Sequence, residues 1–343
     1  MNGESVKDLR EGMLYESADR VVNCRLCNHH CIIRDGARGI CGVRVNLGGK
    51  LYTLAYGRLI ARHVDPIEKK PLFHFQPGTM SYSIATVGCN FRCGFCQNWQ
   101  ISQASKGGAG MLPGEKESPE EIVANAKAKR CASIAYTYTE PTIFFEYAYD
   151  TALLAKEAGL TNVFVTNGYE TPETVEKMQG VIDAANVDLK SFSEEFYIKT
   201  CKARLKPVLE TIRNMYERGI FIEVTTLVIS GKNDSDEELK QIAEFLAGVS
   251  PEIPWHVSAF HPDYEMLDGR VTPVERLLRA MDIGKAAGVK YVYAGNVPGP
   301  GLEDTKCPGC DKTVIERRGY FVGQRHLDGN RCAYCGEMLN LIL

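Results

Sequence analysis

The 343-residue sequence lacks three features that would place a protein in a membrane or nucleic-acid-binding class. No apolar run approaches the roughly 20 residues that a membrane-spanning helix needs. The net charge is only −3, so no excess of basic residues points to nucleic acid or to an anionic membrane. The first residues, Met1 to Asp8, contain no apolar segment of the kind found in signal peptides. The composition, 44% hydrophobic and 24% charged, is that of a globular protein, and we expect a cytoplasmic one.

Cysteine is the residue that the sequence has in excess, with thirteen in all. In a reducing compartment, cysteines at short spacings indicate metal sites rather than disulfides. Two of them, Cys131 and Cys201, stand alone and are expected to be small buried hydrophobic side chains. The others form three groups: Cys24, Cys27, Cys31 and Cys41; Cys89, Cys93 and Cys96; and Cys307, Cys310, Cys332 and Cys335.

The middle group follows an apolar run, Ser81 to Val87, that is typical of a buried strand. Its spacing, C-x3-C-x2-C, allows one loop to hold three corners of a [4Fe–4S] cluster. Because such a cluster has four irons, three thiolates leave one iron free to bind another ligand. A structural zinc knuckle with a fourth ligand from elsewhere is the alternative.

The first group has the spacing C-x2-C-x3-C-x9-C, which fits either a tetrahedral zinc site or a second iron–sulfur cluster. The neighbouring His29 and His30 are expected to be polar loop residues. Asn46 to Lys50 separates two β-rich runs and predicts a hairpin turn. The prolines of the segment 65–75 favour an extended connector.

The last group has the C-x2-C…C-x2-C pattern of a zinc ribbon, with rubredoxin-like iron as the alternative. A tail of this size needs a metal to hold it together. Residues 320–322 fit a short ribbon strand, and the Pro/Gly-rich segment 296–306 fits a linker before it.

Between these groups the sequence alternates between β-rich and helical patterns. Helix starts are predicted from capping boxes at Ser118, Ser235 and Thr272, and from Thr171 before a proline. A further helix is predicted from Pro207 to Arg218, with Leu209, Ile212, Met215 and Tyr216 on one face. The predicted strands are 81–87, 133–138, 161–165, 185–189, 221–228, 254–260 and 291–294. Repeated βα units predict a parallel sheet, either open or closed as a barrel.

Polar residues cluster where several of these strands end. Because the active groups of barrel enzymes lie at the C-terminal ends of the strands, these residues are candidates for a site. They are Thr137, Thr139, Glu140, Thr166, Asn167, Asp188, Lys190, Thr225, Thr226, His256, Ser258 and His261.

The stretch Cys89-Asn-Phe-Arg-Cys93-Gly-Phe-Cys96, with Phe95 before its last cysteine, resembles the signature loop of radical S-adenosylmethionine (SAM) enzymes. The resemblance implies an α/β fold with a partial (β/α)6 barrel of the TIM type, and a [4Fe–4S] cluster whose open iron binds SAM. It also implies that one electron cleaves SAM to a 5′-deoxyadenosyl radical, which abstracts hydrogen from a C–H bond.

The segment Tyr138-Thr-Glu-Pro141 is similar to the second signature of the family, which implies that Glu140 holds the amino group of SAM. Here Tyr138 and Thr139 replace the usual glycines. Asn98 matches an asparagine that follows the cluster cysteines in glycyl-radical-enzyme activases, the type that activates pyruvate formate-lyase.

Two further strand ends, Thr166-Asn-Gly168 and Asp188-Leu-Lys190, resemble those of the same activases. This implies that Asp188 and Lys190 lie near SAM and the reacting centre, as catalytic residues. Val165 stands where activases commonly carry an aspartate that helps to form a cation site. The remaining candidates for SAM binding are Phe95, Thr166, Asn167, Thr225, and one of His256 and His261.

Over nearly its whole length the chain resembles the activase-related subgroup called the AmmeMemoRadiSam system radical SAM enzyme. We expect a Cys-rich N-terminal region with a β-hairpin over residues 1–78, the partial barrel over 79–298 and the zinc ribbon over 299–343. The resemblance implies a protein or peptide substrate, a reductant of the flavodoxin or ferredoxin type, and an association with a Memo-like protein.

Two other functions stay open from the sequence. One is radical SAM modification of RNA or a small metabolite, although the basic residues of the C-terminal ribbon stand among acidic neighbours and disfavour nucleic acid. The other is a non-enzymatic scaffold in which all three cysteine groups bind zinc.

Overall fold

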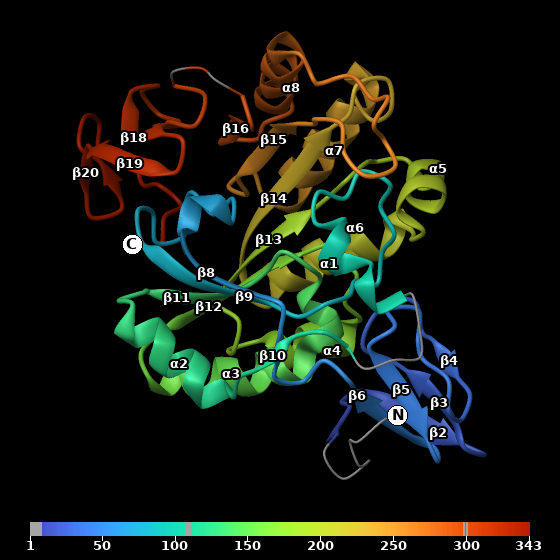
Figure 1. Ribbon diagram of the computed structural model, residues 1–343. Coiled ribbons are helices and arrows are strands. Elements are labelled where there is room, and N and C mark those ends of the chain that lie inside the picture. Colours follow the sequence, from blue (N-terminus) through green and yellow to red (C-terminus); the bar gives the residue numbers. More distant parts are fainter. Residues whose placement is uncertain (1–8, 107–111, 298, 300) are drawn as a thin grey trace.

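The computed structural model describes residues 9–106, 112–297, 299 and 301–343 (Figure 1). The predicted lack of a signal segment concerns residues 1–8, which lie outside this described part. Pro298 and Pro300 of the predicted linker lie outside it as well. Among the described helices, none is both long enough and apolar enough to cross a membrane.

An eight-stranded sheet forms the centre of the structure, and its strands lie side by side in chain order. In the described residues, β9 and all later strands of this sheet are parallel, whereas β8 runs antiparallel to β9 at one edge. The strands are β8 (Ala61–Pro66), β9 (Met80–Ala85), β11 (Ser133–Tyr136), β12 (Thr161–Thr166), β13 (Ala184–Asp188), β14 (Phe221–Val228), β15 (Trp255–Ala259) and β16 (Val292–Gly295).

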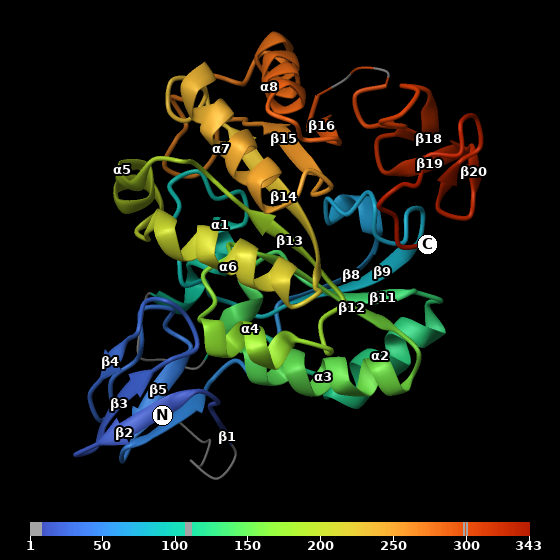
Figure 2. The ribbon, with the colours of Figure 1, turned by 180° about the vertical axis from the view of Figure 1, so that it is seen from behind.

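The longer helices alternate with the parallel strands and cover the outer side of the sheet (Figures 1 and 2). They are α2 (Pro119–Ala128), α3 (Phe145–Glu157), α4 (Pro172–Met178), α6 (Leu205–Glu217), α7 (Asp236–Val249) and α8 (Val274–Ala286). Right-handed crossovers between strands in chain order place every helix on the same face, so the sheet curls as a barrel does. The edge strands β8 and β16 do not pair with each other in the described residues. The predicted α/β partial barrel is therefore confirmed.

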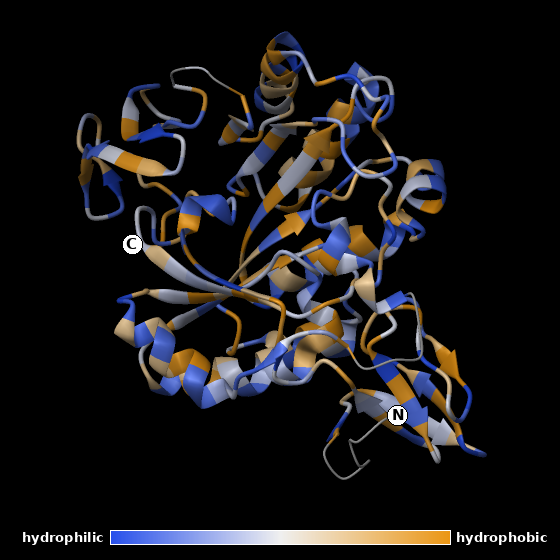
Figure 3. Ribbon diagram, viewed as in Figure 1, coloured by the Kyte–Doolittle hydropathy of each residue, from blue (hydrophilic) through white to orange (hydrophobic). Residues whose placement is uncertain are grey.

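Local sequence explains several of the helix starts. Ser118 begins α2 with the predicted capping box, in which its side chain and that of Glu121 each accept a backbone N–H from the other residue. Thr171 caps α4 through its side-chain oxygen. The long helices carry apolar residues on one side and polar residues on the other (Figure 3), and the apolar sides face the sheet.

Two predicted capping boxes do not form. Ser235 caps α7, but Glu238 does not complete the box. Its carboxylate instead accepts hydrogen bonds from the hydroxyl of Ser191 and the backbone N–H of Phe192. The prediction for Thr272 was wrong, because Pro273 occupies the N-cap position of α8. The buried hydroxyl of Thr272 bonds two backbone groups of neighbouring strand ends. The side chains of Glu238 and Thr272 therefore bond residues far away in the sequence, which the local pattern does not reveal.

The predicted helix over 207–218 begins two residues earlier, at Leu205. Its buried stripe is centred on Val208, Ile212 and Met215, whereas Tyr216 is 44% exposed. The prediction that Tyr216 belongs to the buried face was wrong, because the stripe leaves this position at the edge of the helix–sheet contact.

The N-terminal part forms two small antiparallel sheets that pack beside the barrel. One consists of β1 (Arg10–Glu11), β6 (Lys50–Thr53) and β5 (Arg44–Leu47), and the other of β2 (Tyr15–Ala18), β3 (Val21–Cys24) and β4 (Ile32–Ile33). The predicted hairpin is present, and Gly48 and Gly49 have the positive φ angles, +66° and +91°, that its two-residue turn requires. A short pair, β7 (Arg58–Leu59) with β10 (Glu115–Lys116), adjoins the barrel.

The connector that follows β8 is not extended throughout. A turn of 3₁₀ helix, η2 (Ile67–Lys69), interrupts it. It buries Lys70, which is 1% exposed and donates to Asp65 at 2.7 Å. The ion pair supplies the long-range reason for a bend that the prolines alone do not predict.

The C-terminal ribbon packs against this connector. It is built from β17 (Thr305–Lys306), β18 (Thr313–Arg318), β19 (Phe321–Arg325), β20 (Leu327–Asp328) and β21 (Arg331–Cys332). Arg317 lies over the ring of Phe73 at 4.4 Å and donates to its carbonyl. The carbonyl of Asn340 accepts from Nδ1 of His74 at 2.7 Å. The predicted ribbon strand over 320–322 begins at Phe321 and is longer than predicted.

Candidate active site

A cavity of about 840 Å³ opens at the C-terminal ends of the parallel strands. The loop that carries Cys89, Cys93 and Cys96 forms one wall, and the connector and the tip of the ribbon form another. Residues from nearly every strand end contribute to the lining, among them Thr137, Glu140, Thr166, Asn167, Asp188, Lys190, Thr225, His256 and Ser258. The structure thus brings together side chains that are far apart in the sequence.

The cysteine loop is held in shape by backbone contacts. Gly88 has a φ of +109°, and a Cβ there would lie 2.8 Å from a methyl group of Val43, so only glycine fits. The backbone N–H groups of Arg92 and Gly94 donate to carbonyls of the segment that ends at Cys201. All three loop cysteines line the cavity.

The sulfurs of this loop are not gathered around one point. Within the described residues, only the ribbon cysteines place three or more ligand atoms within 4.8 Å of one another. A cubane requires the wider arrangement, because each thiolate binds a different iron. Three thiolates on one loop that are not gathered within this distance are compatible with a cluster that is held at three of its irons.

Cys201 lies behind this loop. It is fully buried, as predicted, but its thiol is hydrogen-bonded to Cys93, and this contact, followed by burial, raises the pKa of Cys93 well above its usual value. Cys201 is not among the described residues that line the cavity. No sequence motif signals this contact, because the two residues approach only when π-helix η5 (Tyr197–Cys201) packs under the loop.

Glu140 lies at the floor of the cavity beside a second buried carboxylate, that of Glu170. The hydroxyls of Thr142 and Thr166 each lie within 2.9 Å of both carboxylates. Two hydroxyl protons cannot fill four such contacts at once, which favours protonation of one of the two carboxyl groups. Burial, and then the charge of Glu170, raise the pKa of Glu140 to about 7. Glu170 was missed in the sequence because no motif marks it.

Tyr138 adopts the left-handed conformation, with a φ of +63°. This conformation is unfavourable for a tyrosine and requires support. Its hydroxyl bonds Asp65, and the ammonium of Lys70 lies 4.5 Å from its ring centre. Its carbonyl accepts from Nδ2 of Asn98 at 2.9 Å, which ties the cysteine loop to the same strand end.

Lys70, which pairs with Asp65 behind it, is a site residue that the sequence reasoning treated only as part of the connector. Lys70 lines the cavity and is almost fully buried. Burial lowers its pKa to about 8, in spite of the opposing carboxylate of Asp65. The signal was the charged segment from Asp65 to Lys70, in which Asp65, Glu68 and Lys70 are buried while Lys69 stays exposed.

Asp188 and Lys190 face the same cavity and form an ion pair of 2.8 Å. Lys190 lies 5.8 Å from the ring centre of Phe95. Burial alone would lower the pKa of Lys190, but Asp188 and then Cys93 raise it well above the usual value. Lys190 therefore keeps its charge beside the cysteine loop.

The structure separates the two candidate histidines. His256 lines the cavity, bonds Glu223 at 2.7 Å and meets the edge of Phe73 at 4.7 Å. Although burial alone would raise the pKa of Glu223, the bond from His256 lowers it. His261 lies beside Gln97 and is not among the described residues of the lining. Of the two, only His256 remains a candidate for this cavity.

The other predicted residues divide in the same way. Thr225 lines the cavity and donates to Asn186 at 2.9 Å. Thr226 faces away and bonds Trp255 and the carbonyl of Leu189, which is a structural role. Val165 lines the cavity without offering a charge.

The ribbon cysteines form a compact tetrad. Cys307 and Cys335 are 3.6 Å apart at their sulfurs, and Cys310 and Cys332 are 3.8 Å apart. A tetrahedral zinc ion with bonds of about 2.3 Å sets its sulfurs about 3.8 Å apart. The tetrad therefore fits a single ion, as the ribbon prediction requires.

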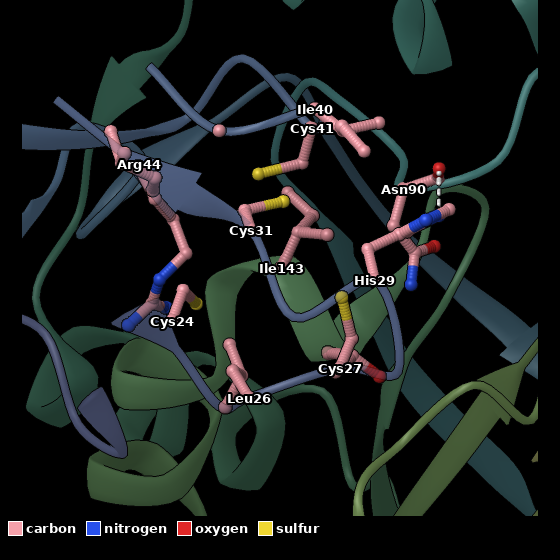
Figure 4. A pocket seen from close by; sticks show the side chains of 13 residues that line it. Cys24, Leu26, Cys27, His29, Cys31, Ile40, Cys41, Arg44, Asn90 and Ile143 are labelled. Atoms are coloured by element: carbon pink, nitrogen blue, oxygen red, sulfur yellow. Dashed lines mark hydrogen bonds between the residues drawn. The ribbon is translucent and has the colours of Figure 1, made fainter. Parts of the chain in front are cut away.

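The N-terminal cysteines line a second, smaller cavity between the N-terminal sheets and the barrel. The sulfurs of Cys27, Cys31 and Cys41 point into this space and Cys24 lies across from them (Figure 4). Burial raises the pKa of Cys41 to about 11 and that of Cys27 well above its usual value. A metal centre bound between these side chains would stabilise the thiolates of Cys27 and Cys41 and offset this effect of burial.

Comparisons with known proteins identify the family. A family model described as the radical SAM superfamily matches residues 83–246. The chain is 44% identical to the uncharacterized protein MJ0808 of Methanocaldococcus jannaschii over 98% of this chain and 100% of that protein. It is 25% identical to a protein of the same organism named "Putative glycyl-radical enzyme activating enzyme MJ1632", over 59% of this chain and 75% of that protein. A radical SAM methyltransferase from Sphaerobacter thermophilus has a similar fold, with a TM-score of 0.52 and 17% identity over 66% of this chain and 68% of that chain.

The chain belongs to the radical SAM superfamily, and it is an enzyme with a likeness to glycyl-radical enzyme activases. The family implies a [4Fe–4S] cluster and SAM, and the residues of the cavity fit both. Cys89, Cys93 and Cys96 supply three thiolates with no fourth cysteine in the described lining. The buried Oδ1 of Asn167, also in the lining, has no hydrogen-bond partner within the described residues, which suits a ligand with N–H or O–H groups.

Proposed function

We propose that the chain binds a [4Fe–4S] cluster and SAM in the large cavity and abstracts hydrogen from a protein or peptide. The observation that carries the proposal is that the cysteine loop, Glu140 and the Asp188–Lys190 pair face one space of about 840 Å³. When bound, the reduced cluster supplies the electron that cleaves SAM and yields the hydrogen-abstracting 5′-deoxyadenosyl radical.

The residues of the chain have distinct roles in this proposal. Cys89, Cys93 and Cys96 hold the cluster. Glu140, once ionised, accepts hydrogen bonds from the amino group of SAM. Its carboxylate is held in position by the backbone N–H groups of Asn167 and Thr142, which donate to it. Asp188 and Lys190 flank SAM from the next strand end, and Lys190 places its positive charge near Cys93. His256 is fixed by Glu223 and orients the far end of the cavity.

A macromolecular substrate is supported by the shape of the entrance. The sheet is open between β8 and β16, and the lining includes Tyr320 at the tip of the ribbon and Glu303 in the linker. A cavity of this volume with a loop-built rim accommodates an extended peptide segment. We also propose zinc for the ribbon and a flavodoxin- or ferredoxin-type reductant.

The first test is anaerobic reconstitution with iron, sulfide, SAM and dithionite. We expect 5′-deoxyadenosine from the wild type and none above background from Cys93→Ala, with Cys131→Ala as a matched variant of a buried cysteine outside the loop. Equal yields from the wild type and Cys93→Ala would refute the assignment of the loop.

The substrate class is tested with an extract from cells grown in deuterated medium. Hydrogen abstraction transfers deuterium into 5′-deoxyadenosine, which mass spectrometry detects. We expect the transfer to persist in the high-molecular-mass fraction and after nuclease treatment, and to disappear after protease treatment. Loss with nuclease, or transfer only from the small-molecule fraction, would contradict a protein substrate.

A further inference from the structure

We propose that Cys24, Cys27, Cys31 and Cys41 hold a second iron–sulfur cluster, which receives electrons from a carrier protein and passes them to the cysteine loop of the barrel. This inference rests on the proposed function, because the electron must reach the cluster that the proposed function places at the cysteine loop. The spacing of the four cysteines fits zinc equally well, so the argument comes from the structure.

The first argument is the arrangement of the sulfurs. The ribbon tetrad lies within 4.8 Å, as one tetrahedral ion requires, whereas no three of the N-terminal cysteines do so in the described residues. They nevertheless line a single cavity (Figure 4). The loop that fits the catalytic cluster shows the same wider spacing. Within one chain, the N-terminal tetrad therefore matches the cluster loop and differs from the ribbon.

The second argument is a buried hydrogen-bond donor beside the cysteines. Arg44 lines the same cavity, is 2% exposed, and pairs with Glu146 through both terminal nitrogens at 2.9 and 2.6 Å. Its third group, Nε, is buried and has no partner within the described residues. Donors of this kind stabilise the sulfurs of iron–sulfur clusters and tune their potentials.

The third argument is position. The cavity is walled on the barrel side by Asn90, Thr142 and Ile143. Asn90 follows Cys89 directly in the sequence, so their Cα atoms are about 3.8 Å apart. Its side-chain oxygen accepts from Asn167 at 2.7 Å, and Asn167 also lies 3.8 Å from the Cys89 sulfur. One residue therefore separates the N-terminal cavity from a ligand of the catalytic cluster.

Contacts of η3 (Ala104–Lys106), the short helix that follows the cysteine loop, with the N-terminal region keep this arrangement rigid. The hydroxyl of Ser105 donates to the carbonyl of Cys41 at 2.7 Å. Gly42 comes so close that a Cβ would lie 2.3 Å from the carbonyl oxygen of Ser105. A purely structural zinc site in a separate N-terminal module would not need such a close fit to the loop.

The outer side of the tetrad offers an entry point. Ile32, next to Cys31, is 77% exposed, and Ile40, next to Cys41, is 45% exposed. The short strand β4 that carries Ile32 forms an apolar edge of the N-terminal sheets (Figure 3). Cys31 is partly buried and Cys41 is buried, so these exposed apolar residues lie directly over the tetrad and fit the docking of a one-electron carrier, a flavin or iron–sulfur protein.

The redox step is a transfer of one electron without any change of bonds to carbon or hydrogen. The carrier is oxidised as the N-terminal cluster is reduced. The N-terminal cluster is oxidised again as the electron passes to the cluster at Cys89, Cys93 and Cys96.

The first test counts metals in the wild-type protein after anaerobic reconstitution. We expect iron and acid-labile sulfide in excess of the roughly four atoms each that one cubane holds. Mössbauer and electron paramagnetic resonance spectra should show a second cluster that disappears in the double variant Cys24→Ala/Cys27→Ala and persists in Cys131→Ala. Zinc in the N-terminal site, or iron and sulfide for one cubane only, would overturn the proposal, and this result does not depend on the folding of any variant.

The second test compares two electron sources. With dithionite, which reaches the catalytic cluster directly, the double variant should cleave SAM as the wild type does. With reduced flavodoxin as the donor, its cleavage should fall to background, and Ile32→Asp should be slowed while keeping both clusters. Equal flavodoxin-driven rates in the wild type and the double variant would refute the electron path.

The two proposals fail in different ways. If the wild type makes no 5′-deoxyadenosine with dithionite, the proposed function is wrong, and the metal count still decides what the N-terminal cysteines bind. If dithionite works and the N-terminal site holds zinc, only the second cluster is refuted.

Discussion

The two buried carboxyl groups of Glu140 and Glu170, which have the same threonine partners, lead to a prediction for the variant Glu170→Gln. In the wild type the pKa of Glu140 is raised from 4.5 to about 7, first by burial and then by the charge of Glu170. A shift of this size corresponds to about 3 kcal/mol of preference for the protonated form. Glutamine keeps the shape and removes one carboxylate, so the pKa of Glu140 should fall and the contribution of burial should remain.

The sign of the stability effect follows from proton linkage. Because the folded protein binds more protons at this pair than the unfolded chain does, wild-type stability without SAM should fall as the pH rises from about 4.5 to 7. In Glu170→Gln this slope should be smaller. Urea unfolding at several pH values measures it.

The same substitution should change SAM binding. Since ionised Glu140 accepts hydrogen bonds from the amino group of SAM more strongly than the protonated acid does, wild-type affinity should weaken about fivefold from pH 7 to 6, as expected for titration of one group with a pKa of about 7. In Glu170→Gln the weakening should begin at lower pH. Anaerobic calorimetry across this range measures the affinity. Glu173→Gln, an exposed carboxylate of α4 paired with Arg25, is the control. Identical pH profiles for the wild type and Glu170→Gln would refute the conclusion that Glu170 raises the pKa of Glu140.

Three further predictions concern other parts of the structure. Removal of the ribbon metal by a chelator, or Cys332→Ser, should lower the melting temperature and release one equivalent of zinc, and an unchanged melting curve would argue against a structural ion. Lys70→Met should destabilise the protein by about 3 kcal/mol in urea, because it leaves a buried carboxylate without its buried partner, whereas Lys69→Met, at an exposed position, should cost less than about 1 kcal/mol. Gly88→Ala should lower the iron content of the reconstituted protein, because a side chain at this positive φ displaces the loop from Val43. A normal iron content in this variant would show that the loop tolerates the shift.

The sequence predicted those features that depend on neighbouring residues. Strands and helices follow from periodicity and turn residues, as in the hairpin at Gly48 and Gly49 and the capping box at Ser118. The cysteine spacings predicted the tight tetrad of the ribbon, because its two pairs each lie in one short turn. The resemblance to radical SAM enzymes likewise begins with one short loop, and the comparisons confirm the family.

The remaining features depend on contacts between distant segments. Thr272 was diverted from its helix by a neighbouring strand, and Cys201 meets Cys93 across more than a hundred residues. The inward turn of Lys70 and the pairing of Glu170 with Glu140 appear only when the barrel is closed around them. The roles of the cavity residues in SAM binding stay predictions, because their common location does not by itself identify the ligand.

The contact between the ribbon and the barrel has a consequence for how the enzyme depends on its surroundings. Arg317 covers one face of Phe73, and the edge of Phe73 meets His256 in the cavity wall. Loss of the ribbon metal would therefore loosen one wall of the large cavity as well as the ribbon itself. We expect the supply of a non-redox ion to set the fraction of molecules competent for radical chemistry.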